Sequence, residues 1–110
     1  MTTVFEVNSS LCGNKTQITA ELVEKSKIKI NIESTCPKVK KYAELLNDLG
    51  VRELVSSMID NPVYIKAAHA KITPDCLIPS GAMLTAWTEA GMVSKNLLKK
   101  CGPQCIIFIK

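Results

Sequence analysis

Two segments of alternating apolar and polar residues, joined by a short polar turn, constrain the fold more than any other feature of the chain. Residues 16–23 and 27–33 both alternate with a period of two, which is typical of strands that bury one face. The polar residues between them suit a tight connection, so we predict a β-hairpin. The apolar members are Ile18, Ala20 and Leu22 in the first segment and Ile28, Ile30 and Ile32 in the second.

The hydrophobic period changes after Cys36-Pro37. Apolar residues from Val39 onward follow one helical stripe, and we expect Gly50 to end this helix. Pro37 suits the first helical position because the missing N–H is not needed there. Further helices are predicted over 51–59 (with Leu54, Val55 and Met58 inward), over 62–70, from an N-cap at Ser80 to about residue 91, and as a last turn over 95–100.

The remaining strands lie at the two ends of the chain. Residues 3–8 alternate weakly, and the β-branched, apolar segment 105–109 reads as a terminal strand. Strands first and helices later indicate a single α+β domain over residues 1–110. We therefore expect a small antiparallel sheet, made of strand, hairpin and C-terminal strand, covered on one face by three or four helices.

Composition narrows the classes of partner. The net charge is only +4 and aromatic residues make up 5% of the chain, so we expect no nucleic-acid partner. No apolar run approaches the length of a membrane span, and the N-terminus lacks the pattern of a signal peptide, so we expect no membrane partner and a cytoplasmic location. In a reducing compartment, cysteines near turns are more often ligands or redox-active thiols than disulfides.

Three of the five cysteines lie where a turn meets a regular element. Cys12 precedes Gly13, Cys36 lies at the start of a helix, and Cys76 lies in the turn before the last long helix. If both helices point their N-termini toward the same edge of the sheet, the three sulfurs converge. Thiolates are soft ligands that favour zinc or an iron–sulfur cluster.

The fourth ligand is less evident. His69 is the only histidine, and Asp75 is adjacent to Cys76; both are candidate metal ligands, although a helix-surface histidine and a turn-capping aspartate are equally ordinary roles. Cys101 and Cys105 are separated by three residues. This pair could form a disulfide, contribute extra ligands or pack in the core. Core packing is the default expectation for Cys105, and exposure is the expectation for Cys101.

These motifs resemble two families. In order of elements, Cys12-Gly13-Asn14, Cys36-Pro37 and Asp75-Cys76 are similar to the U-type iron–sulfur cluster scaffold proteins. Those scaffolds carry Asp where Asn14 stands and His where Asp75 stands, so the resemblance implies a binding site more than active cluster transfer. The segments Cys12-Gly13, Ser34-Thr35-Cys36-Pro37 and 76–81 also resemble a poorly characterised family of small cytosolic proteins from anaerobic microbes.

The sequence thus favours a metal-binding protein, a carrier or scaffold for an iron–sulfur cluster or zinc, that uses Cys12, Cys36 and Cys76. Two alternatives stay open: a non-catalytic interaction domain with core cysteines, and a thiol-dependent sulfur carrier with Cys36 as nucleophile. No general base is evident from the spacing, so no enzymatic activity is assigned. The expected partners are a protein in cluster or sulfur transfer, or a second copy paired through the terminal strand.

Overall fold

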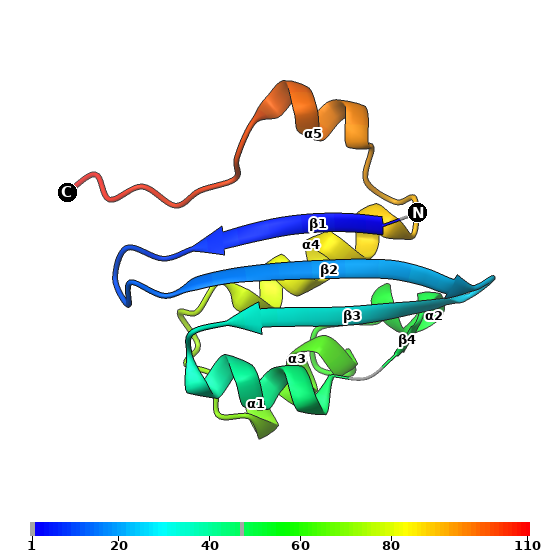
Figure 1. The fold of residues 1–110 in the computed structure, drawn as a ribbon, viewed down its shortest axis with the longest axis horizontal. Helices are drawn as coiled ribbons and strands as arrows, with labels where there is room; N and C mark the ends of the chain where they lie inside the picture. Colours follow the sequence, from blue (N-terminus) through cyan, green and yellow to red (C-terminus); the bar gives the residue numbers. More distant parts are fainter. Residues whose placement is uncertain (1, 47) are drawn as a thin grey trace.

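Four strands form one antiparallel sheet in the order β1-β2-β3-β4 (Figure 1). The computed structural model describes residues 2–46 and 48–110. The strands are β1 (Thr2–Asn8), β2 (Lys15–Glu24), β3 (Lys27–Ser34) and the two-residue β4 (Leu49–Gly50).

The predicted hairpin is confirmed as β2 and β3. Ile18 pairs with Ile32, and Ala20 pairs with Ile30, so the apolar side chains of both strands point to the same face. All four are buried, and they form the floor of the hydrophobic core. Leu22 remains 44% exposed, although its partner Ile28 is buried, and the register of the hairpin shifts just beyond this pair.

Helices cover one face of this sheet, which confirms the α+β class. In Figure 1, α4 crosses behind β1 and β2, α1 lies along β3, and α5 lies beyond the edge formed by β1. No helix within residues 2–46 and 48–110 is long and apolar enough to cross a membrane. The helices are α1 (Pro37–Leu45), α2 (Val51–Leu54), α3 (Pro62–His69), α4 (Ile78–Glu89) and α5 (Lys95–Cys101).

The first helix is shorter than its apolar stripe predicts. It ends at Leu45, and Gly50 is not its cap, because Leu49 pairs with Ile28 as part of β4. The backbone N–H of Val51 then donates to Ser26 O at 2.8 Å. The free edge of β3 offers hydrogen bonds that a continued helix would leave unused, and Leu49 is buried there as well. Asn47, inside the predicted helix, is outside the described residues.

The second helix is also shorter than predicted. Leu54 is buried as expected, but Val55 is 59% exposed and Met58 is 67% exposed, so these two were wrongly assigned to the core. The cause is Asn61, whose side-chain amide donates to three carbonyls, those of Glu53, Leu54 and Ser56. An amide that satisfies these end carbonyls favours the termination of the helix.

The last long helix begins earlier than predicted. Leu77 is the N-cap of α4 and Pro79 lies in its first turn, so Ser80 is inside the helix and is not its cap. Proline at the start of a helix loses no hydrogen bond, which allows the helix to include the Pro-Ser-Gly segment.

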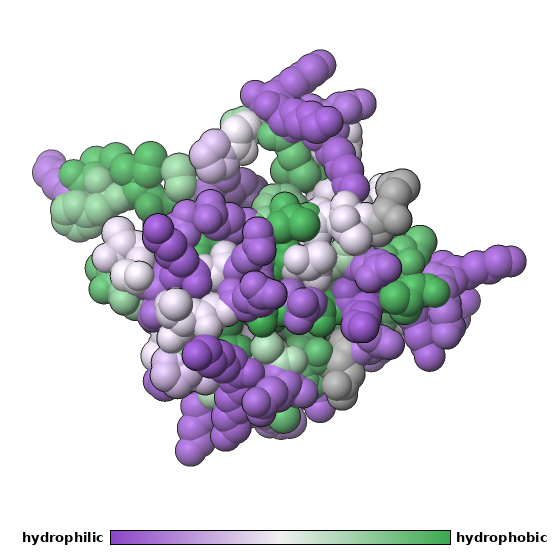
Figure 2. Space-filling view, viewed as in Figure 1, coloured by the Kyte–Doolittle hydropathy of each residue, from purple (hydrophilic) through white to green (hydrophobic). Residues whose placement is uncertain are grey.

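The C-terminal segment does not form the predicted strand. Residues 102–110 have no regular secondary structure, and β4 supplies the fourth strand instead. Pro103 has no N–H to give to a neighbouring strand, and the apolar residues after it do not alternate with polar ones, so neither face is distinguished as the buried one. Figure 2 shows this tail as an apolar projection at the left of the molecule. Its exposed residues include Ile106, Ile107, Phe108 and Ile109.

Candidate functional site

A row of paired residues at one end of the sheet positions Cys36. Val7 pairs with Thr16, and Thr16 pairs with Ser34 in the next strand. The Thr16 and Ser34 hydroxyls are 2.7 Å apart and hydrogen-bonded, and the backbone N–H of Cys36 donates to Ser34 Oγ at 3.1 Å. Two hydroxyls thus fix Cys36 as the N-cap of α1, where Pro37 begins the helix.

The loop that carries Cys12 is tied to the same junction. Thr35 Oγ1 donates to Asn14 Oδ1 at 2.8 Å, across 21 residues of sequence. Within the loop, the N–H of Gly13 donates to Ser9 O at 3.0 Å, and Gly13 adopts a φ of 70° that favours glycine. Asn14, which stands where the scaffold proteins carry Asp, therefore connects two cysteine-bearing segments.

The third cysteine reaches this end through the packing of α4. At Gly81, in the early part of the helix, a Cβ atom would be 2.7 Å from Val7 Cγ2 and 3.3 Å from Ile18 Cδ1. Only glycine allows this close approach, so the start of α4 lies directly against the row that positions Cys36. Cys76 lies directly before Leu77, the N-cap of α4, and its N–H donates to Thr73 O at 3.0 Å.

We call this region, formed by residues 9–14, 34–36 and 73–77, the cysteine end of the sheet. In Figure 1 the three segments lie together at the left, where β1 and β3 end and α4 begins. The structure therefore places the segments that carry Cys12, Cys36 and Cys76 at the same end of the sheet, while the convergence of the three sulfurs themselves stays a prediction. Cys36 and Cys76 are half-buried against the core, and Cys12 is exposed.

The pKa of Cys76 is affected by burial and by the charges of the other two thiols. Burial raises the pKa of Cys76, while the backbone N–H of Ile78 lowers it; the charges of Cys36 and Cys12 raise it further. The opposite holds for the exposed thiol: the backbone N–H of Asn14, followed by the side chain of Ser9, lowers the pKa of Cys12. Cys76 therefore lies within electrostatic reach of both other sulfurs, as like charges disfavour one another's ionisation.

The three cysteine-bearing segments share one end of the sheet, but their side chains do not form a ready metal site. Across the described ranges 2–46 and 48–110, no three His, Cys, Asp or Glu side chains are close enough together to hold a metal ion. His69, at the last position of α3, and Asp75, beside Cys76, are both exposed. Asp75 contributes a negative charge that raises the pKa of Cys76.

The two remaining cysteines lie outside the cysteine end. Cys101 ends α5 and is exposed as expected, whereas Cys105 was expected in the core and is exposed instead. The reason is the tail, which joins no sheet and so provides no buried face.

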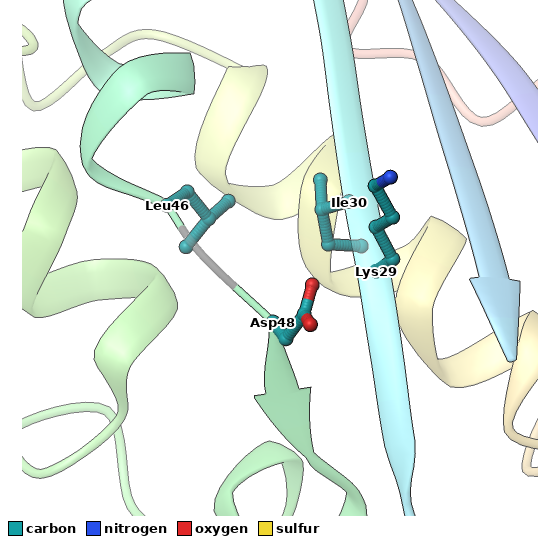
Figure 3. A pocket seen from close by; sticks show the side chains of 4 residues that line it. All are labelled: Lys29, Ile30, Leu46 and Asp48. Atoms are coloured by element: carbon teal, nitrogen blue, oxygen red, sulfur yellow. The ribbon is translucent and has the colours of Figure 1, made fainter. Parts of the chain in front are cut away.

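A hollow of about 350 Å³ lies elsewhere, between β3 and the connection from α1 to β4 (Figure 3). Its lining consists of Lys29, Ile30, Leu46 and Asp48. These side chains include no thiol and no imidazole, and the hollow is wide open. The cysteine end is therefore the better candidate for chemistry.

The structure thus defines a small α+β protein with three thiols gathered at one end of its sheet. Residues 3–101 match the model of a family of unknown function, DUF6951, and the chain belongs to that family. The match spans the described strands and helices, apart from Thr2 at the start of β1, and leaves out the tail. Comparison with curated proteins gives no match, and neither does comparison with solved structures.

Two groups of polar residues hold the fold and the candidate site in place, and their structural roles were not predicted from the sequence. One is the set of polar connectors Asn14, Ser34 and Thr35, for which the Ser-Thr pair before Cys36-Pro37 was an available signal of local capping. The other is Glu89, which is buried at the opposite end of the sheet. The residues near it in the sequence do not predict this burial.

Proposed function

We propose that the protein binds zinc or an iron–sulfur cluster through Cys12, Cys36 and Cys76. The observation that carries this proposal is the meeting of three cysteine-bearing segments at one end of the sheet. Two of these segments are joined by the hydrogen bond from Thr35 to Asn14, and the third is held by the close contact of Gly81 with Val7.

The surroundings of the thiols suit a soft metal. Cys36 and Cys76 pack against the apolar core, which limits competition from water. Both lie at or beside the start of a helix, where the backbone favours negative charge. Thiolates in such places are preferred by zinc and by iron–sulfur clusters over magnesium or calcium.

The exposure of Cys12 supports a role as carrier or scaffold. A loop that is accessible to solvent allows a partner protein to reach a bound ion or cluster and exchange ligands with it. The resemblance of the motif order to U-type scaffolds adds weight to the cluster, whereas Asn14 and Asp75 depart from the scaffold pattern. Metal or cluster storage and delivery is thus the proposed activity, with a second protein as the recipient.

Purification without oxygen, followed by analysis of zinc, iron and acid-labile sulfide, tests this proposal. The wild-type chain is expected to retain one of these at close to one site per chain. Cys12→Ser, Cys36→Ser and Cys76→Ser should each lower that content, while Cys101→Ser, a change at an exposed cysteine outside the site, should not. Wild-type protein that holds none, even after reconstitution with zinc or with iron and sulfide, contradicts the proposal.

A thiol-dependent sulfur carrier is the second candidate, and the exposure of Cys12 favours it. The Cys12 thiolate would attack the outer sulfur of a donor persulfide; a new S–S bond forms at Cys12, and the donor cysteine leaves as a thiolate. This assignment moves the nucleophile from Cys36, where the sequence suggested it, to the thiol that a donor can reach. The Asn14→Asp variant described in the Discussion tests it.

A further inference from the structure

A second hollow, of about 490 Å³, lies between the free edge of the sheet and the C-terminal tail. One wall is the last half of β1, including Val7 and Asn8, together with the first turns of α4. The other wall is the tail, from Gly102 to Ile106. Figure 1 shows the tail running past β1 toward the cysteine end.

This hollow connects the tail with the candidate metal site. Its walls include Leu77, which directly follows Cys76, and Asn8, the last residue before the segment that carries Cys12. Cys105 lines the same hollow from the tail side. A fourth thiol therefore lies across one open space from the segment that carries Cys76 and from Asn8, the residue just before the segment that carries Cys12.

Hydrogen bonds do not hold the described residues of the tail in their present place. Among the described residues, those from 103 onward make no hydrogen bond to the rest of the chain, and the last one before them joins Gly102 N–H to Leu98 O at 3.2 Å. Gly102, with a φ of 72°, is a natural hinge between α5 and the tail. Movement about this point would break no hydrogen bond.

We propose that the tail closes over the hollow and supplies Cys105 as the fourth thiolate of the metal site. This inference rests on the proposed function, because it completes the site of Cys12, Cys36 and Cys76. Structural zinc sites are almost always four-coordinate, and clusters commonly have four thiolate ligands. His69 and Asp75, the fourth ligands suggested by sequence, are then not required.

Closure is also favoured by apolar burial. Ile106 is 83% exposed, and the hollow that it borders is lined by Phe5, Val7 and Leu84. Moving the tail inward places the isoleucine against these side chains and removes apolar surface from water. The same motion carries Cys105 toward the start of α4.

Zinc titration of the purified full chain, followed by timed alkylation of each thiol, tests the inference. With zinc bound, Cys105 should be protected from alkylation together with the three site cysteines, while Cys101 should stay reactive. Cys105→Ser should weaken zinc binding by about tenfold or more, since a first ligand matters at least as much as the groups that orient it. Cys101→Ser is the matched control and should bind zinc as the wild type does.

A cobalt titration gives an independent readout. Thiolate-to-cobalt absorption should be weaker in Cys105→Ser than in Cys101→Ser, because one sulfur ligand is lost. Ile106→Ser keeps the thiol but weakens closure, and it should bind zinc a few-fold less tightly.

The outcomes separate this inference from the proposed function. If zinc protects Cys12, Cys36 and Cys76 but leaves Cys105 as reactive as Cys101, then Cys105 is not the fourth ligand. The proposed function still stands in that case. An equal zinc affinity for Cys105→Ser and wild type leads to the same conclusion. A chain that binds neither zinc nor an iron–sulfur cluster overturns both.

Discussion

The two ends of the sheet are closed in different ways. At the end near the β2–β3 turn, the carboxylate of Glu89 is buried and accepts hydrogen bonds from Thr3 Oγ1 at 2.8 Å and from the backbone N–H of Leu22 at 3.1 Å. Lys95 Nζ lies 3.8 Å from the same carboxylate. At the cysteine end, hydroxyls and an amide bond to one another, and the thiols are left as free cysteines.

We therefore expect the end with Glu89 to contribute mainly to stability and the cysteine end to the proposed metal binding. A buried carboxylate that accepts hydrogen bonds from two strands locks the end of α4 to the sheet, and its loss leaves unpaired donors. The polar groups of the cysteine end instead hold the loops in place while the sulfurs stay available. One end therefore stabilises the fold, and we expect the proposed metal binding at the other end to be independent of that stabilisation.

The largest effect is expected from Glu89→Ala. Removal of the carboxylate leaves Thr3 Oγ1 and the Leu22 N–H without their acceptor, so the free energy of unfolding should fall by about 3 kcal/mol. Urea unfolding measures this. Lys95→Met, at a partly exposed charge, is the control and should cost less than ~1 kcal/mol.

Zinc affinity of the folded Glu89→Ala protein sharpens the comparison of the two ends. If they act independently, this affinity stays within about twofold of wild type at a denaturant concentration where both are folded. A large loss of zinc binding would show that the stability of one end and the chemistry of the other are coupled.

Gly81→Ala is expected to lower the stability by less than Glu89→Ala does, and also to weaken metal binding by the thiols. The added methyl would meet Val7 Cγ2 at 2.7 Å, and the resulting strain outweighs the better helix propensity of alanine, for a net loss of about 1 kcal/mol. The start of α4 should move away from β1 and carry Cys76 with it. We therefore expect weaker zinc binding as well.

The double variant Gly81→Ala/Val7→Ala distinguishes strain from other causes. Val7→Ala removes the methyl that clashes, so the loss from Gly81→Ala should be smaller in this background than alone. A simple sum of the two single losses in urea unfolding would show that the close contact is not the cause.

The smallest effect on stability is expected from Asn14→Asp, which keeps an oxygen to accept from Thr35 Oγ1. The new negative charge beside Cys12 disfavours the thiolate, so the pKa of Cys12 rises and less thiolate is present near neutral pH. Alkylation of Cys12 should slow by about three- to tenfold, since one pKa unit is tenfold in thiolate. The rate at Cys101 is the internal standard.

The Asn14→Asp result also decides the role of Cys12 in the sulfur-carrier alternative. If sulfur uptake from a donor persulfide slows in parallel with alkylation, the Cys12 thiolate is the nucleophile. Uptake that is unchanged while alkylation slows would exclude Cys12 from that role.

Local sequence patterns predicted the parts of the fold that depend on neighbours in the chain. Alternation in residues 16–33 specified the hairpin and its buried face, and Asn61-Pro62 specified the start of α3, where the Asn61 side chain accepts from the Val63 N–H. The apolar stripe up to Leu49 predicted a longer first helix. A buried apolar residue in a short strand beside β3 gives the same sequence signal as one on the buried face of a helix. Only pairing with Ile28 distinguishes the two.

The candidate site divides in the same way. Cys12, Cys36 and Cys76 were identified from turn residues beside them, which are local signals. Their gathering at one end depends on contacts between segments distant in sequence, such as Thr35 with Asn14 and Gly81 with Val7. Contacts of this kind cannot be predicted from the residues adjacent to each partner in the sequence.

By itself, the sequence determined the α+β class, the hairpin and the placement of three cysteines at the starts or turns of elements. Hydrophobic period and turn chemistry are properties of short segments, so they can be read directly. The tertiary structure alone decided that Leu49 joins the sheet, that the apolar tail stays outside it, and that Glu89 is buried. Those outcomes depend on which strand edges and donors remain free after the whole chain has packed.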